Sequence, residues 1–151
     1  YYLTFLRNQK EDLASGRVPD QNYAREVMQL FSVGLVKLNP DGTVFKDAQG
    51  NSVETYTASD IAGLSKVFTG WSYAGPDATS TRFYGGGTQD VDRMWKPMQA
   101  YPQFHSISEK AFLNFTIPAQ TTADPAKSLQ QALDSLRADG RLAALRKRYG
   151  A

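Results

Sequence analysis

The stretch that decides the fold is PDQNYAREVMQLFSVG, which runs from Pro19 to Gly34. Four apolar residues in it follow an i, i+4, i+7, i+8 spacing, which places them on one face of a helix. They are Tyr23, Val27, Leu30 and Phe31. Asp20 is a favoured N-cap residue, and Gly34 stands where a C′ glycine ends a helix. The stretch therefore predicts an amphipathic helix.

Downstream of this helix, short apolar runs alternate with turn residues. The sequence predicts strands at 35–38, 43–46 and 52–56, with the turn Asn39-Pro40-Asp41-Gly42 between the first two. These three strands would form a small β-meander. Thr57 and Asp60 then resemble a capping box, which predicts a second helix that ends at Gly70.

The segment 72–103 is rich in glycine, proline and aromatic residues, and it predicts a long irregular loop. A weak alternation at 110–115 indicates a short strand. Asp124 and Pro125 fit the N-cap and N1 positions of a last helix with Leu129, Leu133 and Leu136 on its buried face. We therefore expect a mainly α fold, namely a helical domain fragment with a small β-meander insertion and a long irregular aromatic loop.

Composition sets the broad class. The chain has 151 residues, of which 41% are hydrophobic and 21% charged, as in ordinary globular proteins. The absence of cysteine excludes disulfides, thiolate metal sites and cysteine nucleophiles. No run of eighteen apolar residues is present, so the sequence predicts no transmembrane segment.

Charge is distributed unevenly along the chain. Residues 137–151 hold five bases and one acid, whereas residues 1–136 carry a net charge of −2. A nucleic-acid partner is not expected, because the body lacks a basic face. We expect a domain at 1–136, followed by a basic helical tail at 137–151. Because Tyr1 to Leu6 is apolar and not a signal peptide, we also expect the domain to be incomplete.

Two polar positions are candidates for chemistry. Glu26 lies at the border of the apolar face of its helix, next to Arg25. There it could be an acid with a raised pKa, a metal ligand, or half of an ion pair that locks two helices. His105 is the only histidine and could act as a general base, a metal ligand with carboxylate partners, or a hydrogen-bonding scaffold. The sequence does not identify a metal or a cofactor.

Aromatic residues are concentrated in the long loop. They are Tyr73, Phe83, Tyr84, Trp95, Tyr101 and Phe104. Flat rings offer a large contact area for a carbohydrate or peptide, but such rings can also attach a long loop to the core. Both interpretations remain open from the sequence.

Several separated motifs resemble the bacterial domain-of-unknown-function 1800 family. They include Asn22-x-Ala24-Arg25-Glu26, followed by Gln29-Leu30 and Gly34. They also include Tyr56-Thr57 with Asp60, Phe68-Thr69-Gly70-Trp71, and the stretch 101–112 that contains His105 and Lys110. The tail 137–151 instead resembles the closing helix of periplasmic solute-binding proteins.

The resemblance implies a mostly helical, exported bacterial protein, located in the periplasm or outside the cell, with no established reaction. It also implies that the Arg25-Glu26 helix and the Thr69-Gly70-Trp71 turn belong to a shared core.

The sequence is compatible with two functional hypotheses. One is a module that binds a partner protein or a polysaccharide through residues such as Arg25, Trp71, Trp95, Tyr101 and Phe104. The alternative is a hydrolase-like or metal-assisted enzyme built on Glu26, His105 and Lys110. Whether the chain is an enzyme stays open at this point.

Overall fold

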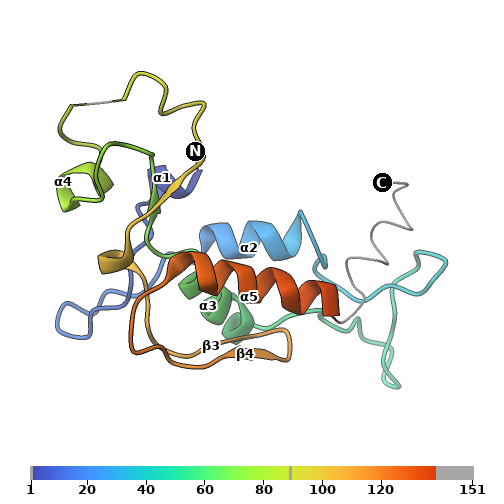
Figure 1. Cartoon of the computed structure of the whole chain (residues 1–151). Coiled ribbons are helices and arrows are strands. Elements are labelled where there is room, and N and C mark those ends of the chain that lie inside the picture. Colours follow the sequence, from blue (N-terminus) through green and yellow to red (C-terminus); the bar gives the residue numbers. More distant parts are fainter. Residues whose placement is uncertain (1, 89, 139–151) are drawn as a thin grey trace.

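The computed structural model describes residues 2–88 and 90–138 (Figure 1). Its helices are α1 (Tyr2–Leu6), α2 (Asn22–Gln29), α3 (Ala58–Val67), α4 (Ser80–Phe83) and α5 (Pro125–Ala138), with a 3-10 helix η1 at Pro102–Phe104. Its strands are β1 (Trp71–Ser72), β2 (Gln99–Ala100), β3 (Lys110–Phe112) and β4 (Phe115–Ile117). The strands form two antiparallel pairs, β1–β2 and β3–β4.

The prediction of a mainly α fold is wrong. Of the described residues, 32% are helical and 13% lie in strands or isolated bridges, so most of this part of the chain is coil with two small sheets. The physical reason is that the chain between the helices carries turn residues at short intervals. Its backbone is held by isolated bridges and side-chain hydrogen bonds rather than by long regular ladders. The predicted basic tail lies outside the described residues from residue 139 onward.

The apolar core lies where α3 packs on α2, on α5 and on the β3–β4 hairpin. Its buried side chains are Ala24, Met28, Ile61, Leu64, Val67, Phe112, Ile117 and Ala132. Gly63 faces the hairpin so closely that a Cβ atom there would overlap the Ala111 carbonyl group. Glycine at this position therefore permits the approach of α3 to β3.

Helix α2 is shorter than the sequence predicts. It begins at Asn22 rather than directly after Asp20, whose Oδ1 accepts a hydrogen bond from the Asn22 N–H at 2.8 Å. It ends at Gln29, so Leu30 and Phe31 lie beyond its last turn and are 64% and 74% exposed. The predicted apolar face is therefore wrong at its C-terminal end, and the side chains that α2 buries are those of Ala24 and Met28.

The predicted capping box at the start of α3 is confirmed. Thr57 Oγ1 accepts a hydrogen bond from the Asp60 N–H at 3.2 Å, and Asp60 Oδ2 accepts one from the Thr57 N–H at 2.7 Å. The second oxygen, Asp60 Oδ1, accepts a hydrogen bond from the Leu113 N–H at 2.7 Å. One carboxylate therefore caps α3 and also fixes the β3–β4 turn against it.

Helix α5 begins at Pro125 as predicted, and Asp124 Oδ1 accepts a hydrogen bond from the Lys127 N–H at 2.9 Å. The predicted buried face is wrong at Leu133, which is 43% exposed, while Ala132 beside it is buried. Burial falls instead on small residues such as Ser128 because α5 packs close to the hairpin and α3.

The segment 35–56 extends away from the helices as a narrow arm (Figure 1). The three stretches for which the sequence predicts strands meet there through isolated antiparallel bridges, Val36 to Glu54, Leu38 to Val44 and Lys46 to Ser52. The arm is thus a ribbon rather than a sheet packed on the core.

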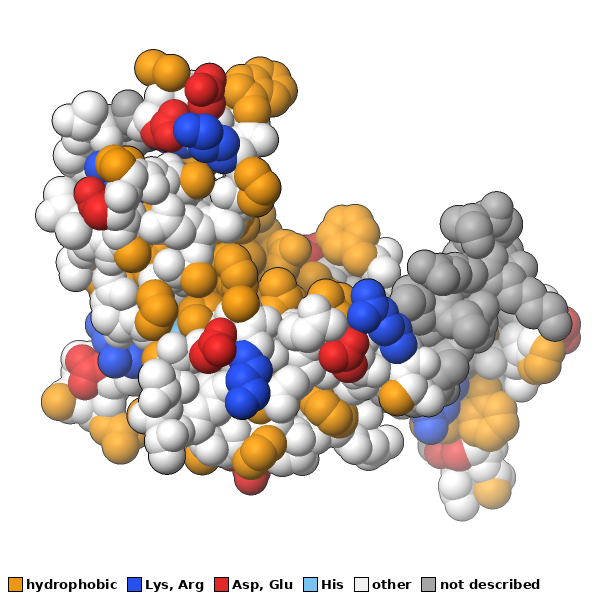
Figure 2. Space-filling model, in the orientation of Figure 1, with side chains coloured by type: hydrophobic (Ala, Val, Ile, Leu, Met, Phe, Trp, Pro, Cys, Tyr) orange, Lys and Arg blue, Asp and Glu red, His pale blue; other side chains and the backbone are white. Residues whose placement is uncertain are grey.

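Figure 2 shows apolar side chains gathering in a concave area of one face, between the part that carries α1 and α4 and the part that carries α2 and α5. Among the described helices, none has both the length and the apolar composition needed to cross a lipid bilayer.

Candidate functional site

A set of polar side chains lies between α3, α5 and the segment 105–120, and we call it the polar network. Its members are Glu11, Thr69, His105, Ser106, Ser108, Lys110, Gln120 and Ser128. The network contains two of the residues that the sequence predicts to be catalytic, His105 and Lys110. Both have an exposed fraction of 0%. The network brings together segments that are up to 95 residues apart in the chain.

The His105 imidazole is bonded through both ring nitrogens. Its Nδ1 lies 2.8 Å from the Thr69 carbonyl oxygen, which can only accept, so Nδ1–H is the donor. Nε2 then accepts a hydrogen bond from Ser128 Oγ at 2.8 Å. Burial lowers the pKa of His105 to about 4, against a smaller opposing effect of the Thr69 hydrogen bond. The ring is therefore neutral near pH 7 and connects the end of α3 to α5.

On one side of the ring, Ser106 contacts a partly buried carboxylate. Glu11 Oε1 accepts a hydrogen bond from Ser106 Oγ at 3.0 Å, and Ser106 Oγ also lies 3.0 Å from Ser108 Oγ. Glu11 Oε2 is buried without a hydrogen-bond partner. Burial acts to raise the pKa of Glu11, but the hydrogen bonds from Ser108 and Ser106 outweigh it and hold that pKa below its usual range. The carboxylate is therefore ionised at neutral pH.

The amine of Lys110 lies between two oxygen acceptors, and both hydrogen bonds are long. Its Nζ lies 3.2 Å from the Ser108 carbonyl oxygen and 3.4 Å from Gln120 Oε1. Burial lowers the pKa of Lys110 to about 8, with Glu11 opposing this change and Lys66 adding to it. The amine of Lys110 is therefore closer to neutrality than that of an exposed lysine, which is a property of amines that act as bases or nucleophiles.

Glu26 and Arg25 lie on α2, outside the polar network. Glu26 is half-buried, Arg25 is exposed, and within residues 2–88 and 90–138 neither side chain forms an ion pair or a hydrogen bond. In the same ranges, no three His, Asp or Glu side chains are grouped so that they could hold a metal ion. The structure thus brings His105 and Lys110 into one network but leaves Glu26 out of it. The assignment of all three as catalytic residues stays a prediction.

The aromatic residues of the long loop have two different environments. Tyr101 is fully buried, Phe83 stacks on Phe104 with ring centroids 4.0 Å apart, and Phe83 also packs edge-on against Tyr101. Burial raises the pKa of the Tyr101 hydroxyl, which donates a hydrogen bond to the Tyr73 carbonyl oxygen at 2.7 Å. These rings attach the loop to the rest of the molecule.

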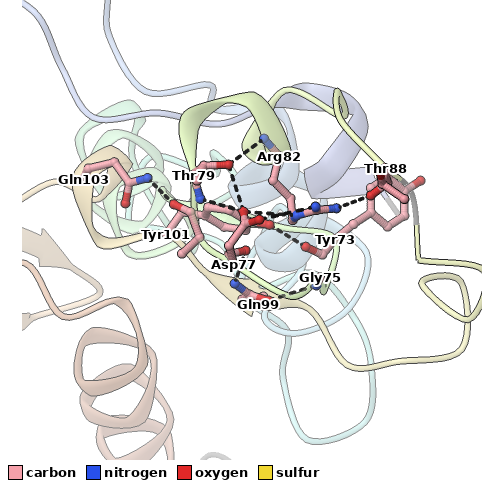
Figure 3. Close-up of polar contacts among 10 residues, drawn as sticks. Tyr73, Gly75, Asp77, Thr79, Arg82, Thr88, Gln99, Tyr101 and Gln103 are labelled. Atoms are coloured by element: carbon pink, nitrogen blue, oxygen red, sulfur yellow. Dashed lines mark hydrogen bonds and ion pairs between the residues drawn. The ribbon is translucent and has the colours of Figure 1, made fainter.

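The same loop contains a buried arginine, which Figure 3 shows at the centre of the polar contacts. Arg82 is 8% exposed, and its Nε lies 3.2 Å from Asp77 Oδ1. Its Nη1 donates to the Thr88 carbonyl oxygen at 2.8 Å, and its side chain packs against Gly75, where a Cβ would overlap it. The nearby guanidinium lowers the pKa of Asp77. Arg82 therefore connects α4 to two stretches that have no regular structure, residues 75–77 and the backbone at Thr88.

Gln99 and Gln103 extend this anchoring (Figure 3). Gln99 Oε1 accepts a hydrogen bond from the Gly75 N–H at 3.0 Å, and Gln99 Nε2 donates to the Asp77 carbonyl oxygen at 2.8 Å. Gln103 Nε2 donates to the Ala78 carbonyl oxygen at 2.6 Å. Most polar groups at the base of the loop are thus used to fix its backbone.

Beyond this base, the loop exposes apolar side chains at residues 91–95, which we call the loop tip. Trp95 is 87% exposed, Val91 90% and Met94 55%. Trp71, by contrast, is half-buried on β1, and its Nε1 is buried without a partner. Of the aromatic residues predicted to bind, Trp95 is therefore the one presented to solvent, whereas Tyr101 and Phe104 help to hold the loop.

Sequence reasoning missed several members of these sites. Nothing local singles out Glu11, Gln120 or Ser128, because their partners are distant in the chain. For Arg82 the nearby sequence did offer a signal of an ion pair, because Asp77 lies five residues before it. Thr79 caps the short helix α4 that carries Arg82.

Two of the motifs that carried the family resemblance meet in this structure. Thr69-Gly70 contacts the segment around His105, since the Tyr101 N–H donates to the Gly70 carbonyl oxygen at 2.8 Å. Gly70 has a φ of +76°, and a Cβ there would crowd the Tyr101 carbonyl oxygen at 2.8 Å. The family model described as "Protein of unknown function (DUF1800)" matches residues 1–145. The chain belongs to the DUF1800 family.

No curated protein and no solved structure gives a significant match to this DUF1800 chain. The family description names no reaction and no ligand. Roles for individual residues of this DUF1800 protein therefore rest on the geometry described above.

Proposed function

We propose that this DUF1800 chain is a protein-binding module that presents Trp95 and its neighbours at the loop tip to a partner protein. The observation that carries the proposal is the exposure of Val91, Met94 and Trp95 within five residues of chain. Tryptophan and methionine are enriched in protein–protein interfaces, and tryptophan is among the residues whose removal most weakens binding.

The base of the loop supports this role because it is held in place before any partner arrives. Arg82 and its acceptors fix the backbone on one side, and the Phe83–Phe104 stack fixes it on the other. A loop that is already ordered loses less conformational entropy on binding than a free one. The Arg93 guanidinium, 4.9 Å from the centre of the Tyr73 ring, connects the tip to this base.

A protein partner fits the tip better than a polysaccharide does. The apolar neighbours of Trp95 at the tip are Val91 and Met94. Of the charged side chains there, Lys96 is paired with Asp90 and Arg93 lies over the Tyr73 ring, which leaves Asp92 to bond a sugar. A sugar ring on Trp95 would need free polar side chains around it to bond its hydroxyl groups. We place the interaction in the periplasm or outside the cell, because resemblance to the family suggests export.

The test is a binding measurement with a matched control. Photo-crosslinking from position 92, which leaves Trp95 in place, identifies the partner in cells of the source organism, and calorimetry with the purified partner gives the dissociation constant. We expect Trp95→Ala to weaken binding at least tenfold and to leave the melting temperature unchanged. Phe31→Ala, which removes an aromatic ring that is 74% exposed elsewhere, should leave binding unchanged. Equal affinities of Trp95→Ala and the wild type would refute the proposal, as would Trp95-dependent capture of a glycan.

A further inference from the structure

A pocket that belongs neither to the loop tip nor to α2 lies at the start of α5. It adjoins the segment that leads from β4 into this helix, and Figure 1 shows the course of that segment. Its volume is about 540 Å³, within the range of ordinary small-ligand sites. One wall is formed by the segment 117–123 and the other by three residues of α5 and its cap, Asp124, Lys127 and Gln131. The i, i+3, i+7 spacing of these three places them on one face of the helix.

Gln131 gives the pocket an uncommitted hydrogen-bonding group. Its Oε1 is buried without a partner. An unsatisfied buried acceptor costs about 1–3 kcal/mol, so such groups in folded proteins call for an explanation. Its neighbour Gln130, by contrast, donates to Asp134 Oδ1 at 2.9 Å. Because Oε1 has no contact with solvent, the Gln131 side chain would have to rotate to bring it into the pocket. A ligand that donates to it there would satisfy this acceptor, and no hydrogen bond of that amide to the described residues would have to break.

A second amide reaches the pocket from the opposite wall. Gln120 Oε1 faces Lys110 Nζ at 3.4 Å and Ser128 Oγ at 3.3 Å. Its Nε2 makes none of the hydrogen bonds found among the described residues, so this donor is open to a ligand. The exposed hydroxyl groups of Thr121 and Thr122 stand beside it. The pocket therefore offers both donors and acceptors from neutral groups.

Charge and shape narrow the class of ligand. The lining holds one acid, Asp124, and one base, Lys127, so it has no net charge to attract an ion. Pro102 and Pro118 supply apolar surface. The pocket thus combines neutral amide and hydroxyl groups with apolar side chains. These groups are complementary to a ligand that has hydroxyl groups at its edges and C–H groups on its faces.

We propose that this pocket binds a neutral oligosaccharide, with Gln131 and Gln120 bonding its hydroxyl groups. A hydroxyl group both donates and accepts, so one sugar hydroxyl can satisfy an amide oxygen while a second accepts from an amide N–H. This site is separate from the loop tip, and it does not depend on Trp95.

The experiment titrates the full chain with cellohexaose, maltohexaose and chitohexaose, and follows binding by calorimetry and by the side-chain amide signals of Gln131 and Gln120. We expect at least one of these sugars to bind and to shift both amide signals. Gln131→Leu should weaken binding at least tenfold while the melting temperature stays the same or rises, because an unsatisfied polar group is removed. The matched control, Gln130→Leu, should change the affinity less than twofold.

Three results would overturn the proposal. They are the absence of binding for all three sugars at millimolar concentration, an unchanged affinity in Gln131→Leu, and tighter binding of an uncharged peptide than of any sugar at the same amide signals. Trp95→Ala should bind the sugar as the wild type does, which separates this site from the proposed protein-binding function.

Discussion

The core around α3 and the loop segment 72–103 are stabilised by different means. In the core, apolar side chains from α2, α3, α5 and the hairpin pack together, and Gly63 lets the backbone of α3 approach β3. In the loop, one buried arginine and a few glutamine and tyrosine side chains hold backbone that has little regular structure. The stability of the core should therefore respond to changes in side-chain volume, whereas that of the loop should respond to the loss of specific hydrogen bonds.

The largest effect is expected in the core, from Gly63→Ala. Alanine is normally preferred over glycine in a helix by about 1 kcal/mol. Here the added Cβ would overlap the Ala111 carbonyl group, which is backbone and cannot rotate away. We expect a net loss of about 3 kcal/mol of unfolding free energy, measured by urea denaturation.

Gly16→Ala is the matched control for this change. Gly16 has a φ of +70° and no atom within 4 Å of its Cβ position, so only the left-handed backbone conformation disfavours alanine. The expected loss is about 1 kcal/mol. If Gly63→Ala were as stable as Gly16→Ala, the close contact of α3 with β3 would be contradicted.

An effect of about the same size concerns His105, which lies between the two regions. Its pKa is about 4 in the folded chain and about 6.5 when unfolded. Between these values the unfolded state binds more protons, so stability is complete above pH 6.5 and falls as the pH drops toward 4. The loss should reach about 3 kcal/mol.

Denaturation of the wild type and of His105→Gln at pH 7, 6 and 5 measures this dependence. The glutamine variant should be less stable at pH 7, but it should lose less stability than the wild type as the pH falls. Parallel curves for the two proteins would show that burial does not lower the pKa of His105 in the folded chain.

A smaller, local effect is expected for Arg82→Met in the loop. The substitution removes the bonds to Asp77 and Thr88, but Asp77 is 44% exposed and can regain water. We therefore expect a loss of about 2 kcal/mol, less than for a fully buried ion pair. Limited proteolysis should cut within residues 77–99 before the core unfolds. Simultaneous loss of core and loop would show that the two regions are one cooperative unit.

The smallest effect has the opposite sign. Lys110→Met should stabilise the chain by about 1–2 kcal/mol at pH 7, because it removes a buried charge with two long hydrogen bonds. The pKa of Lys110 is about 8 in the folded chain, against 10.5 when exposed. The wild type therefore gains stability as the pH rises from 8 toward 10.5, and the advantage of the variant should shrink over that range. Destabilisation by Lys110→Met at pH 7 would mean that the ammonium group contributes favourably.

Parts of the fold could be predicted from local patterns. The capping box of Thr57 and Asp60 and the start of α5 at Asp124-Pro125 were correct, because a cap depends on residues within one turn. The ends of helices were less predictable. Leu30 and Phe31 continue the apolar spacing of α2, but the chain leaves the helix at Gln29. Periodicity alone does not reveal where tertiary contacts stop supporting a helix.

The candidate sites show a similar division. His105 and Trp95 could be picked out by residue type, but whether each is buried or exposed depended on the fold. The contact of Glu11 with Ser106 spans 95 residues, and the pairing of Lys110 with Gln120 requires the β3–β4 hairpin to form first. Such contacts are set by tertiary structure and have no signal in the local sequence.

Amide hydrogen exchange of the native chain tests most directly the claim that the loop is anchored at its base and free at its tip. We expect slow exchange for the N–H groups of Gly75, Phe83 and Tyr101, which donate hydrogen bonds at the base, and fast exchange at Val91. Fast exchange at all four positions would contradict this claim, because the loop would then have no fixed base from which to present Trp95.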